Sequence, residues 1–129
     1  MRYYLDTSVA LRAIHNVPEK TRIRVWINSL PRGCLVSSRL LKTEMIRTLR
    51  RDARPLAEAD PVLSRVWLTE LTEAIVTVAE AIEPHVKTLD ALHLATALTI
   101  GEPITVATHD RSMLQAAKIL GLPTHDPAV

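Results

Sequence analysis

Short apolar runs alternate with longer segments of helical periodicity along this 129-residue chain, and this alternation restricts the fold more than any other feature. We predict strands at Arg2–Asp6, Cys34–Ser37, Ala74–Val78, Pro103–Ala107 and, at an edge, Leu122–Thr124. Strands that are separated by helices indicate an α/β fold with a mostly parallel central sheet flanked by helices. The length fits one compact domain spanning residues 1–129.

Apolar spacing and capping residues place helices between these strands. The predicted helices are Thr7 or Ser8 through Ile14, Glu19–Leu30, Ser38 through Leu49, Pro61–Leu71, Glu80–Val86, Leu89–Ile100, and Asp110 or Ser112 through Leu120. In Pro61–Leu71 we expect Val62, Val66 and Trp67 to point inward. Gly101 and Gly121 are expected to end the last two helices.

Composition narrows the class of function. Aromatic residues make up only 3% of the chain and Phe is absent, so the core must consist of Leu, Ile, Val and Ala, and stacking of bases on aromatic platforms is disfavoured. Cys34 is the one cysteine, which excludes an intrachain disulfide. No signal segment and no membrane-spanning run is evident, so we expect a cytoplasmic protein.

Basic residues gather in the segment around Glu44. The net charge of +2 is too small to imply nucleic-acid binding by itself. The local cluster is more informative, and consists of Arg39, Lys42, Arg47, Arg50, Arg51 and Arg54 against Glu44 and Asp52. It is typical of a solvated helix face or of a rim that holds phosphates, and the charge pattern leaves both interpretations open.

Four acidic residues lie where a strand ends or a helix begins, namely Asp6, Glu44, Asp90 and Asp110. Each has an ordinary structural explanation. Asp6 and Asp110 can cap helices, Asp90 can interact with a helix dipole, and Glu44 can pair with Arg47 or Thr48. His93 lies one turn after Asp90 and can hydrogen-bond it, and a buried, satisfied histidine is favoured there over a metal ligand.

The predicted topology nevertheless brings these acids to one place. Ligands of open parallel sheets bind outside the carboxyl ends of the strands. Asp6 and Asp110 follow such ends, and the helices of Glu44 and Asp90 begin at the same edge. Converging carboxylates need a counter-charge, and a hard divalent cation such as Mg²⁺ supplies it. Metal-assisted phosphodiester chemistry is therefore the leading hypothesis.

The order of these motifs resembles the PIN-domain nucleases and, within them, the VapC toxins of bacterial and archaeal toxin–antitoxin pairs. The resemblance spans nearly the whole chain. It rests on Leu5-Asp6-Thr7-Ser8, on Glu44 in a helix after a strand ending Ser37-Ser38, on Asp-Ala-Leu-His-Leu-Ala-Thr-Ala from Asp90, and on Thr108-x-Asp110. It implies a three-layer PIN-like sandwich, an endoribonuclease, a VapB-type antitoxin partner and a homodimer.

By this resemblance Asp6, Glu44, Asp90 and Asp110 correspond to the family's metal-binding, catalytic acids. Thr7, Ser8 and Thr108 correspond to its supporting hydroxyls. The chain departs from the family where Arg111 and Ser112 replace a further acid that often follows Asp110, and His109 is assigned no role.

An all-carboxylate site selects Mg²⁺, with Mn²⁺ as a substitute, over Zn²⁺. We expect Asp6 and Asp90 to be the tightest ligands, and Glu44 and Asp110 to complete the cage or orient a metal-activated water that attacks RNA. The expected phosphate contacts are Arg47, Arg50, Arg51 and Arg111.

Other classes fit the sequence less well. A haloacid-dehalogenase-type phosphatase needs an acid two residues after Asp6, where Ser8 stands, and a phosphorylation receiver needs a lysine that Pro103–Asp110 lacks. Three glycines cannot build a Walker-type loop. A catalytically silent PIN-like module that binds RNA or protein remains the alternative.

Overall fold

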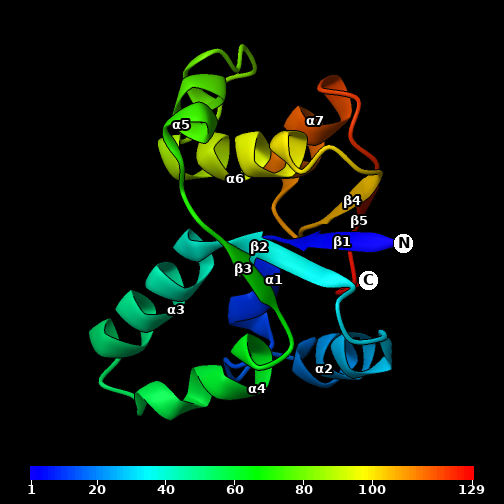
Figure 1. Ribbon diagram of the computed structural model, residues 1–129. Helices are drawn as coiled ribbons and strands as arrows, with labels where there is room; N and C mark the ends of the chain where they lie inside the picture. The colour runs from blue at the N-terminus through cyan, green and yellow to red at the C-terminus, as the bar shows by residue number, and fades with distance from the viewer.

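A fully parallel, five-stranded sheet forms the middle of the computed structural model, which describes residues 1–129 (Figure 1). The strands lie in the order β3 (Trp67–Thr69), β2 (Leu35–Ser38), β1 (Arg2–Leu5), β4 (Ile104–Ala107) and β5 (Thr124–His125). From β1 the chain adds β2 and β3 in one direction, and then β4 and β5 on the opposite side of β1. The direction of strand addition therefore reverses between β1 and β4.

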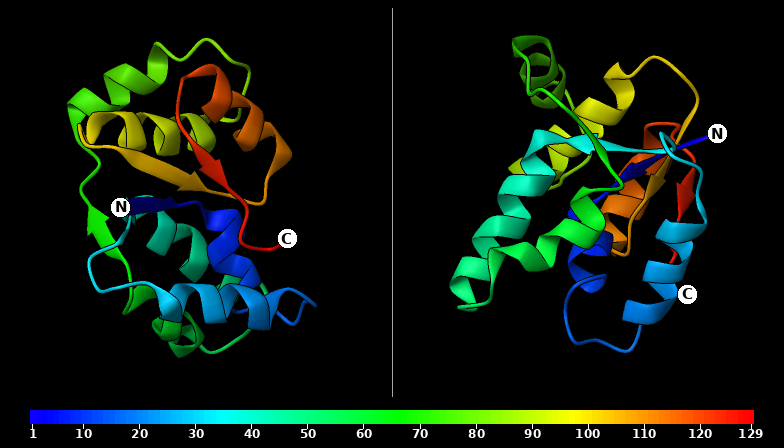
Figure 2. Two further views of the ribbon diagram at one scale, coloured as in Figure 1. Left: turned by 90° about the vertical axis from the view of Figure 1, so that its right-hand side faces the viewer. Right: turned by 60° about the horizontal axis from the view of Figure 1, so that its bottom comes forward.

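Helices cover both faces of this sheet (Figures 1 and 2). One face carries α1 (Thr7–Arg12), α2 (Lys20–Ser29), α3 (Arg39–Arg51), a 3-10 turn η1 (Leu56–Ala59) and α4 (Asp60–Leu63). The other face carries α5 (Glu73–Glu80), α6 (Thr88–Thr99) and α7 (Arg111–Ile119), with α5 lying against α6. The expected α/β fold with three layers is confirmed. No helix is long and apolar enough to cross a bilayer.

Alternation along the strands divides the core in two. Leu5 and Leu35 point toward α1–α4 and join an apolar cluster with Met45 and Leu49. Their strand neighbours, such as Tyr4, point the other way and pack with the inner faces of α6 and α7. Because successive side chains of a strand face opposite sides, a short strand that is buried on both faces carries apolar residues on each of them.

The predicted helix Pro61–Leu71 is wrong. α4 ends at Leu63, and Trp67–Thr69 forms the edge strand β3 paired with Val36–Ser38 of β2. Trp67 was expected inside, but its side chain is 71% exposed on this edge. Leu68 contacts the apolar cluster instead. A residue run this short carries too few turns for helical periodicity to distinguish it from a strand.

The predicted strand Ala74–Val78 is also wrong, because these residues lie within α5. Thr72 caps that helix by accepting a hydrogen bond from the Ile75 N–H, and Glu73 stands in its first turn. Capping and packing against α6 thus outweigh the β-branched composition. The expected helix Glu80–Val86 is absent, since α5 ends where that segment begins and α6 starts only at Thr88.

Most remaining boundaries agree with prediction to within a few residues. Ser38 caps α3 through the Leu40 N–H, while Gly101 and Gly121 follow α6 and α7 with positive φ angles. Positive φ is available to glycine without steric cost, which explains both helix ends. Val9 and Ile14, in and just after α1, are buried core residues.

The placement of Trp67 and Leu49 predicts opposite outcomes for two truncations. Leu49→Ala should destabilise the protein by about 2–5 kcal/mol because it opens a cavity in a fully buried cluster. Trp67→Ala should cost less than about 1 kcal/mol, because the side chain is mostly in solvent. Urea unfolding of both variants checks this. Equal losses for the two would contradict the assignment of Trp67 to an exposed edge strand.

Candidate active site

The candidate site lies at the carboxyl ends of β1 and β4, where the order of strand addition reverses. Asp6 directly follows β1, and Thr108 directly follows β4. Leu5 is paired with Ala107, and the Asp6 N–H donates to the Ala107 carbonyl at 3.0 Å. This register sets Asp6 beside Thr108, although they are 102 residues apart in the sequence.

The other predicted acids reach the same edge through their helices. α3 follows β2 and so begins at this edge, with Glu44 in its second turn. α6 precedes β4 and runs antiparallel to it, so its first turn, with Asp90, lies there as well. Asp110 caps α7 just after β4. Because Asp6, Glu44 and Asp110 all act electrostatically on Asp90, the four acids are near neighbours.

Asp6 is held by hydroxyl groups rather than by a helix end. Its Oδ2 accepts hydrogen bonds from Ser8 Oγ at 2.7 Å and Thr108 Oγ1 at 2.8 Å. The side chain makes no capping bond to α1, so the capping explanation for this residue is wrong. The side chain is nearly inaccessible to solvent, with 4% of the residue exposed. Its position is therefore fixed by β1 and β4 together.

Asp110 does act as a helix cap, as its structural explanation proposed. Its Oδ1 accepts hydrogen bonds from the backbone N–H groups of Ser112 at 2.8 Å and Met113 at 3.2 Å. The capping bonds use one carboxylate oxygen only. The role of a cap and the role of a metal ligand are thus compatible in this residue.

Glu44 pairs with neither Arg47 nor Thr48. Its Oε1 accepts hydrogen bonds from Thr7 Oγ1 at 2.8 Å and from His93 Nε2 at 2.6 Å. His93, which the sequence allowed to hydrogen-bond Asp90, binds Glu44 instead, 49 residues away in the sequence. The sequence analysis missed this contact because helix periodicity places His93 beside Asp90 and says nothing of α3.

The three hydrogen-bonded acids share one arrangement. In Asp6, Glu44 and Asp110, one oxygen accepts two hydrogen bonds and the other has no protein partner. None of the partnerless oxygens is sealed from solvent, because the one buried side-chain polar atom without a partner is His15 Nε2. Each carboxylate is thus anchored through one oxygen and offers the second for coordination.

Asp90 differs because its carboxyl group makes no side-chain hydrogen bond. Burial, followed by the negative charges of Asp6 and Asp110, raises the pKa of Asp90 to about 6, and His93 opposes the shift. Burial and the neighbouring carboxylates thus disfavour the charged form of this acid. A raised carboxyl pKa in a cleft is also a common property of functional sites.

The donor set fits a hard divalent cation. As the side chains stand, no three His, Cys, Asp or Glu groups are close enough to hold an ion together. Mutual repulsion of four carboxylates favours such separation, and a cation reverses it. The free oxygens and the unbonded Asp90 side chain can contract around an ion while the anchoring bonds stay in place. Oxygen donors alone suit Mg²⁺ or Mn²⁺.

Comparison with known proteins identifies the family of this chain. The PIN domain family model matches residues 3–119, which is most of the chain. The chain belongs to the PIN-domain family. Ribonuclease VapC47 of Mycobacterium tuberculosis is 31% identical over 96% of both chains, and ribonuclease VapC35 of the same organism is 32% identical over 92%. A toxin–antitoxin complex from Klebsiella pneumoniae shares the fold, with a TM-score of 0.73 at 17% identity over 97% of both chains.

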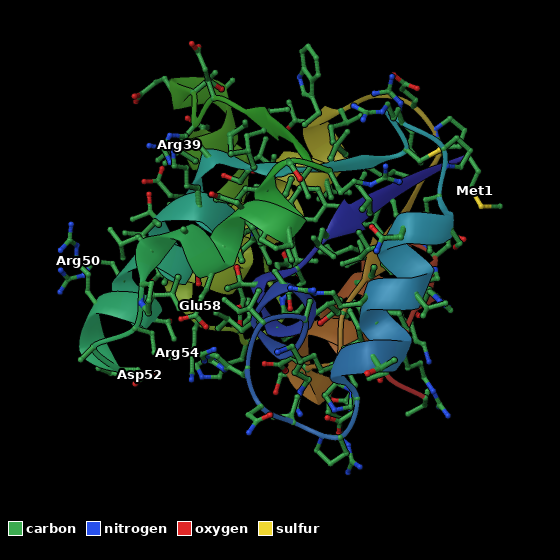
Figure 3. The ribbon with its side chains drawn as sticks, turned by 90° about the horizontal axis from the view of Figure 1, so that it is seen from below. Met1, Arg39, Arg50, Asp52, Arg54 and Glu58 are labelled. Atoms are coloured by element: carbon green, nitrogen blue, oxygen red, sulfur yellow. The ribbon has the colours of Figure 1, made fainter.

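Basic side chains of this PIN domain differ in their relation to the acids. Arg47 and Arg51 lie three and seven residues after Glu44 and share its side of α3. Arg50 lies about 120° around the helix from Glu44. Figure 3 shows Arg50 projecting outward from the end of α3. Arg51 is paired with Asp52 at 3.1 Å. Of the predicted phosphate contacts on α3, Arg47 is thus the most favourably placed and Arg50 is the least.

One cation that was not predicted from the sequence, Lys87, lines the site. A cleft of about 420 Å³ is bounded by Asp90 and Asp110 together with His85 and Lys87, both of which are exposed. Arg111, also exposed, starts α7 directly after Asp110. Lys87 is the N-cap residue of α6, three positions before Asp90. The position of Lys87 three residues before Asp90 was the only signal in the sequence. The wrongly predicted helix Glu80–Val86 concealed that Lys87 stands at the start of α6.

The raised pKa of Asp90 predicts that Asp90→Asn stabilises the metal-free PIN domain. Since the folded-state pKa of about 6 exceeds the ordinary value of 3.8, the native state binds the proton more tightly. Native stability therefore falls as the pH rises from about 4 to 6, and the penalty persists above 6. The group is only half-buried, so solvent screening limits the expected gain at pH 7.5 to about 1 kcal/mol.

Urea unfolding with a chelator, at pH 7.5 and at pH 4, measures this gain. The difference between Asp90→Asn and the native protein should vanish at the lower pH. Glu83→Gln, which removes an exposed carboxylate from the connection between α5 and α6, should leave stability unchanged at both pH values. A variant Asp90→Asn that is no more stable than the native protein at pH 7.5 would refute the electrostatic account of this site.

Proposed function

We propose that this PIN domain is a Mg²⁺-dependent endoribonuclease and the toxin of a VapBC-type toxin–antitoxin module. The observation that carries the proposal is the meeting of four carboxylates, three of which keep one oxygen free of protein hydrogen bonds. Relatives named ribonuclease at about 30% identity over nearly the whole chain support the choice of RNA as substrate.

In this proposal the oxygens that hold the ion are Asp6 Oδ1, Glu44 Oε2, Asp110 Oδ2 and the carboxylate of Asp90. We assign the tightest contacts to Asp6 and Asp90, as expected from the sequence. Mn²⁺ is an acceptable substitute because it prefers the same oxygen donors. When bound, the ion supplies a water of lowered pKa and neutralises charge on the phosphodiester.

The residues of the chain position the reactants. Ser8 and Thr108 keep Asp6 in one rotamer, and Thr7 does the same for Glu44, so the acids need little reorganisation when RNA arrives. Arg47, Arg111 and Lys87 surround the acids with positive charge and are our choice for contacts to the RNA backbone. Arg51 can join them by leaving Asp52, since an exposed pair of this kind contributes little stability.

An antitoxin partner is part of the proposal. The structurally similar protein from Klebsiella pneumoniae belongs to a toxin–antitoxin complex. In the present chain a groove of about 640 Å³ is bordered by α3, η1, α4 and β3, and its apolar lining is Ile46, Leu56, Ala57, Leu63 and Leu68. Such a groove can accept the apolar face of a partner helix. A homodimer is proposed from the family resemblance alone.

The alternative, a catalytically silent module that binds RNA or protein, has one specific observation against it. A binding module has no use for four partly buried carboxylates, one of which carries a raised pKa. Loss of selection for catalysis leaves no reason to keep oxygens free of hydrogen bonds. We therefore place the silent module second.

Cleavage of structured RNA by the purified protein tests the proposal. The native chain should cleave with Mg²⁺ and stop when chelator is added. Asp6→Asn and Asp90→Asn should each lower the cleavage rate more than about 100-fold. Loss of a metal ligand should reduce activity at least as much as loss of a residue that orients a ligand, which costs about 10–100-fold. Asp60→Asn, which makes the same chemical change on α4, should retain full activity.

Two results would count against the proposal. Cleavage that persists in both active-site variants would exclude the carboxylate mechanism. Binding of RNA without cleavage, by a preparation shown by mass spectrometry to be free of a co-purified inhibitor, would favour the silent module.

A further inference from the structure

A buried chain of hydrogen bonds leads from the middle of the sheet to Glu44. His93 on α6 has only 1% of its surface exposed. Its Nδ1 lies 2.6 Å from the hydroxyl of Tyr4 on β1, and its Nε2 lies 2.6 Å from Glu44 Oε1 on α3. Three elements from distant parts of the sequence are thereby joined through one imidazole ring.

The partners of the ring define where its protons lie. A carboxylate can only accept, so Nε2 must carry the proton that is shared with Glu44. In the neutral ring Nδ1 is then an acceptor, and the Tyr4 hydroxyl donates to it. The Ser38 N–H donates to that hydroxyl at 3.1 Å, which leaves the hydroxyl proton free for Nδ1.

The same contacts determine how Glu44 is oriented. A glutamate side chain has three rotatable bonds, and its helix alone cannot choose which oxygen faces the neighbouring acids. Nε2 of His93 and the Thr7 hydroxyl both bind Oε1, which leaves Oε2 as the free oxygen. The Tyr4 ring stands at 70° to the imidazole, with centroids 5.7 Å apart, and restricts the tilt of His93.

We propose that Tyr4 and His93 are positioning residues that hold the Nε2–H tautomer and thereby direct the free oxygen of Glu44 toward the divalent ion. Neither residue touches the ion or the RNA. The proposal rests on the proposed function for the identity of the ion. The assignment of the tautomer does not depend on any activity. Removal of a group that orients a metal ligand by hydrogen bonding commonly lowers the metal affinity about 10–100-fold.

The competing explanation is a histidine that only stabilises the core. Both explanations predict some loss of stability when His93 is replaced, so stability cannot separate them. They differ in the metal affinity of the folded protein. The tautomer tests the contacts on which the positioning role rests, because a protonated Nδ1 is incompatible with a hydroxyl that donates to it.

The first measurement is the tautomer of His93 in the native protein. Long-range ¹H–¹⁵N correlation spectra of ¹⁵N-histidine-labelled protein at pH 7.5 should show a protonated Nε2 and a bare Nδ1. A protonated Nδ1, alone or together with Nε2, would overturn the proposal. This experiment needs no variant, metal or RNA.

The second measurement is the affinity for Mn²⁺, by isothermal titration, of variants that are folded by circular dichroism. His93→Leu should bind 10–100-fold more weakly, and His93→Gln, whose amide can donate near the position of Nε2, should recover most of the loss. Tyr4→Phe should weaken binding severalfold. Its control is Tyr3→Phe. The Tyr3 side chain lies on the opposite face of β1, and its hydroxyl makes no hydrogen bond.

Cleavage by these variants gives an independent signature. If His93 acts through Glu44 and the ion, raising the Mg²⁺ concentration should restore the rate of His93→Leu, and the main change should be in the Mg²⁺ dependence. Unchanged Mn²⁺ affinity in both His93→Leu and Tyr4→Phe would overturn the positioning role. Should His93→Leu fail to fold, Tyr4→Phe, which keeps its ring, decides the question alone.

Failure of this inference is distinguishable from failure of the proposed function. A native protein that binds Mn²⁺ in the predicted way but cleaves no RNA refutes the nuclease and leaves the positioning role intact. A protein that cleaves RNA with Mg²⁺, but whose variants bind Mn²⁺ as the native chain does, refutes the positioning role and leaves the nuclease.

Discussion

The pairing of β1 with β4 is the constraint on which the rest of the molecule depends. These strands are far apart in the sequence, and their register sets Asp6 beside Thr108 at the end of the sheet. It also creates the point at which the order of strands reverses, and such points are where open parallel sheets bind ligands. A slip of one residue would turn Asp6 toward the other layer and remove it from the site.

The acidic cluster is a local electrostatic cost that the fold sustains. Hydrogen bonds stabilise Asp6, Glu44 and Asp110 through one oxygen each, while Asp90 has no such bond and has a raised pKa. Full neutralisation by arginines would make the fold more stable and would fill the coordination positions. One oxygen of each of these three acids is thus fixed by hydrogen bonds, and the other has no protein partner. This arrangement is expected where a site gives up stability for function.

Sequence reasoning succeeded where the signal was local. The ends of strands, helix caps and short acidic motifs placed all four acids at one edge of the sheet. It failed between Pro61 and Val86, where short β-branched and apolar runs fit helix and strand equally well and tertiary packing decided the outcome. It also missed the bond between His93 and Glu44, which are 49 residues apart, because no periodicity relates residues on different helices. Lys87 was missed because the segment before it, Glu80–Val86, was wrongly predicted to be a helix.

The central claim is that each anchored carboxylate offers its second oxygen to a shared ion. Crystals grown with Mn²⁺ test this most directly, because anomalous scattering locates the ion without reference to activity. The ion should lie at ligand distance from Asp6 Oδ1 and from the carboxylate of Asp90, with Glu44 Oε2 or Asp110 Oδ2 on its other side. The bonds from Ser8, Thr108 and His93 should remain. An ion bound elsewhere, or bound through oxygens that had given up those bonds, would contradict the account.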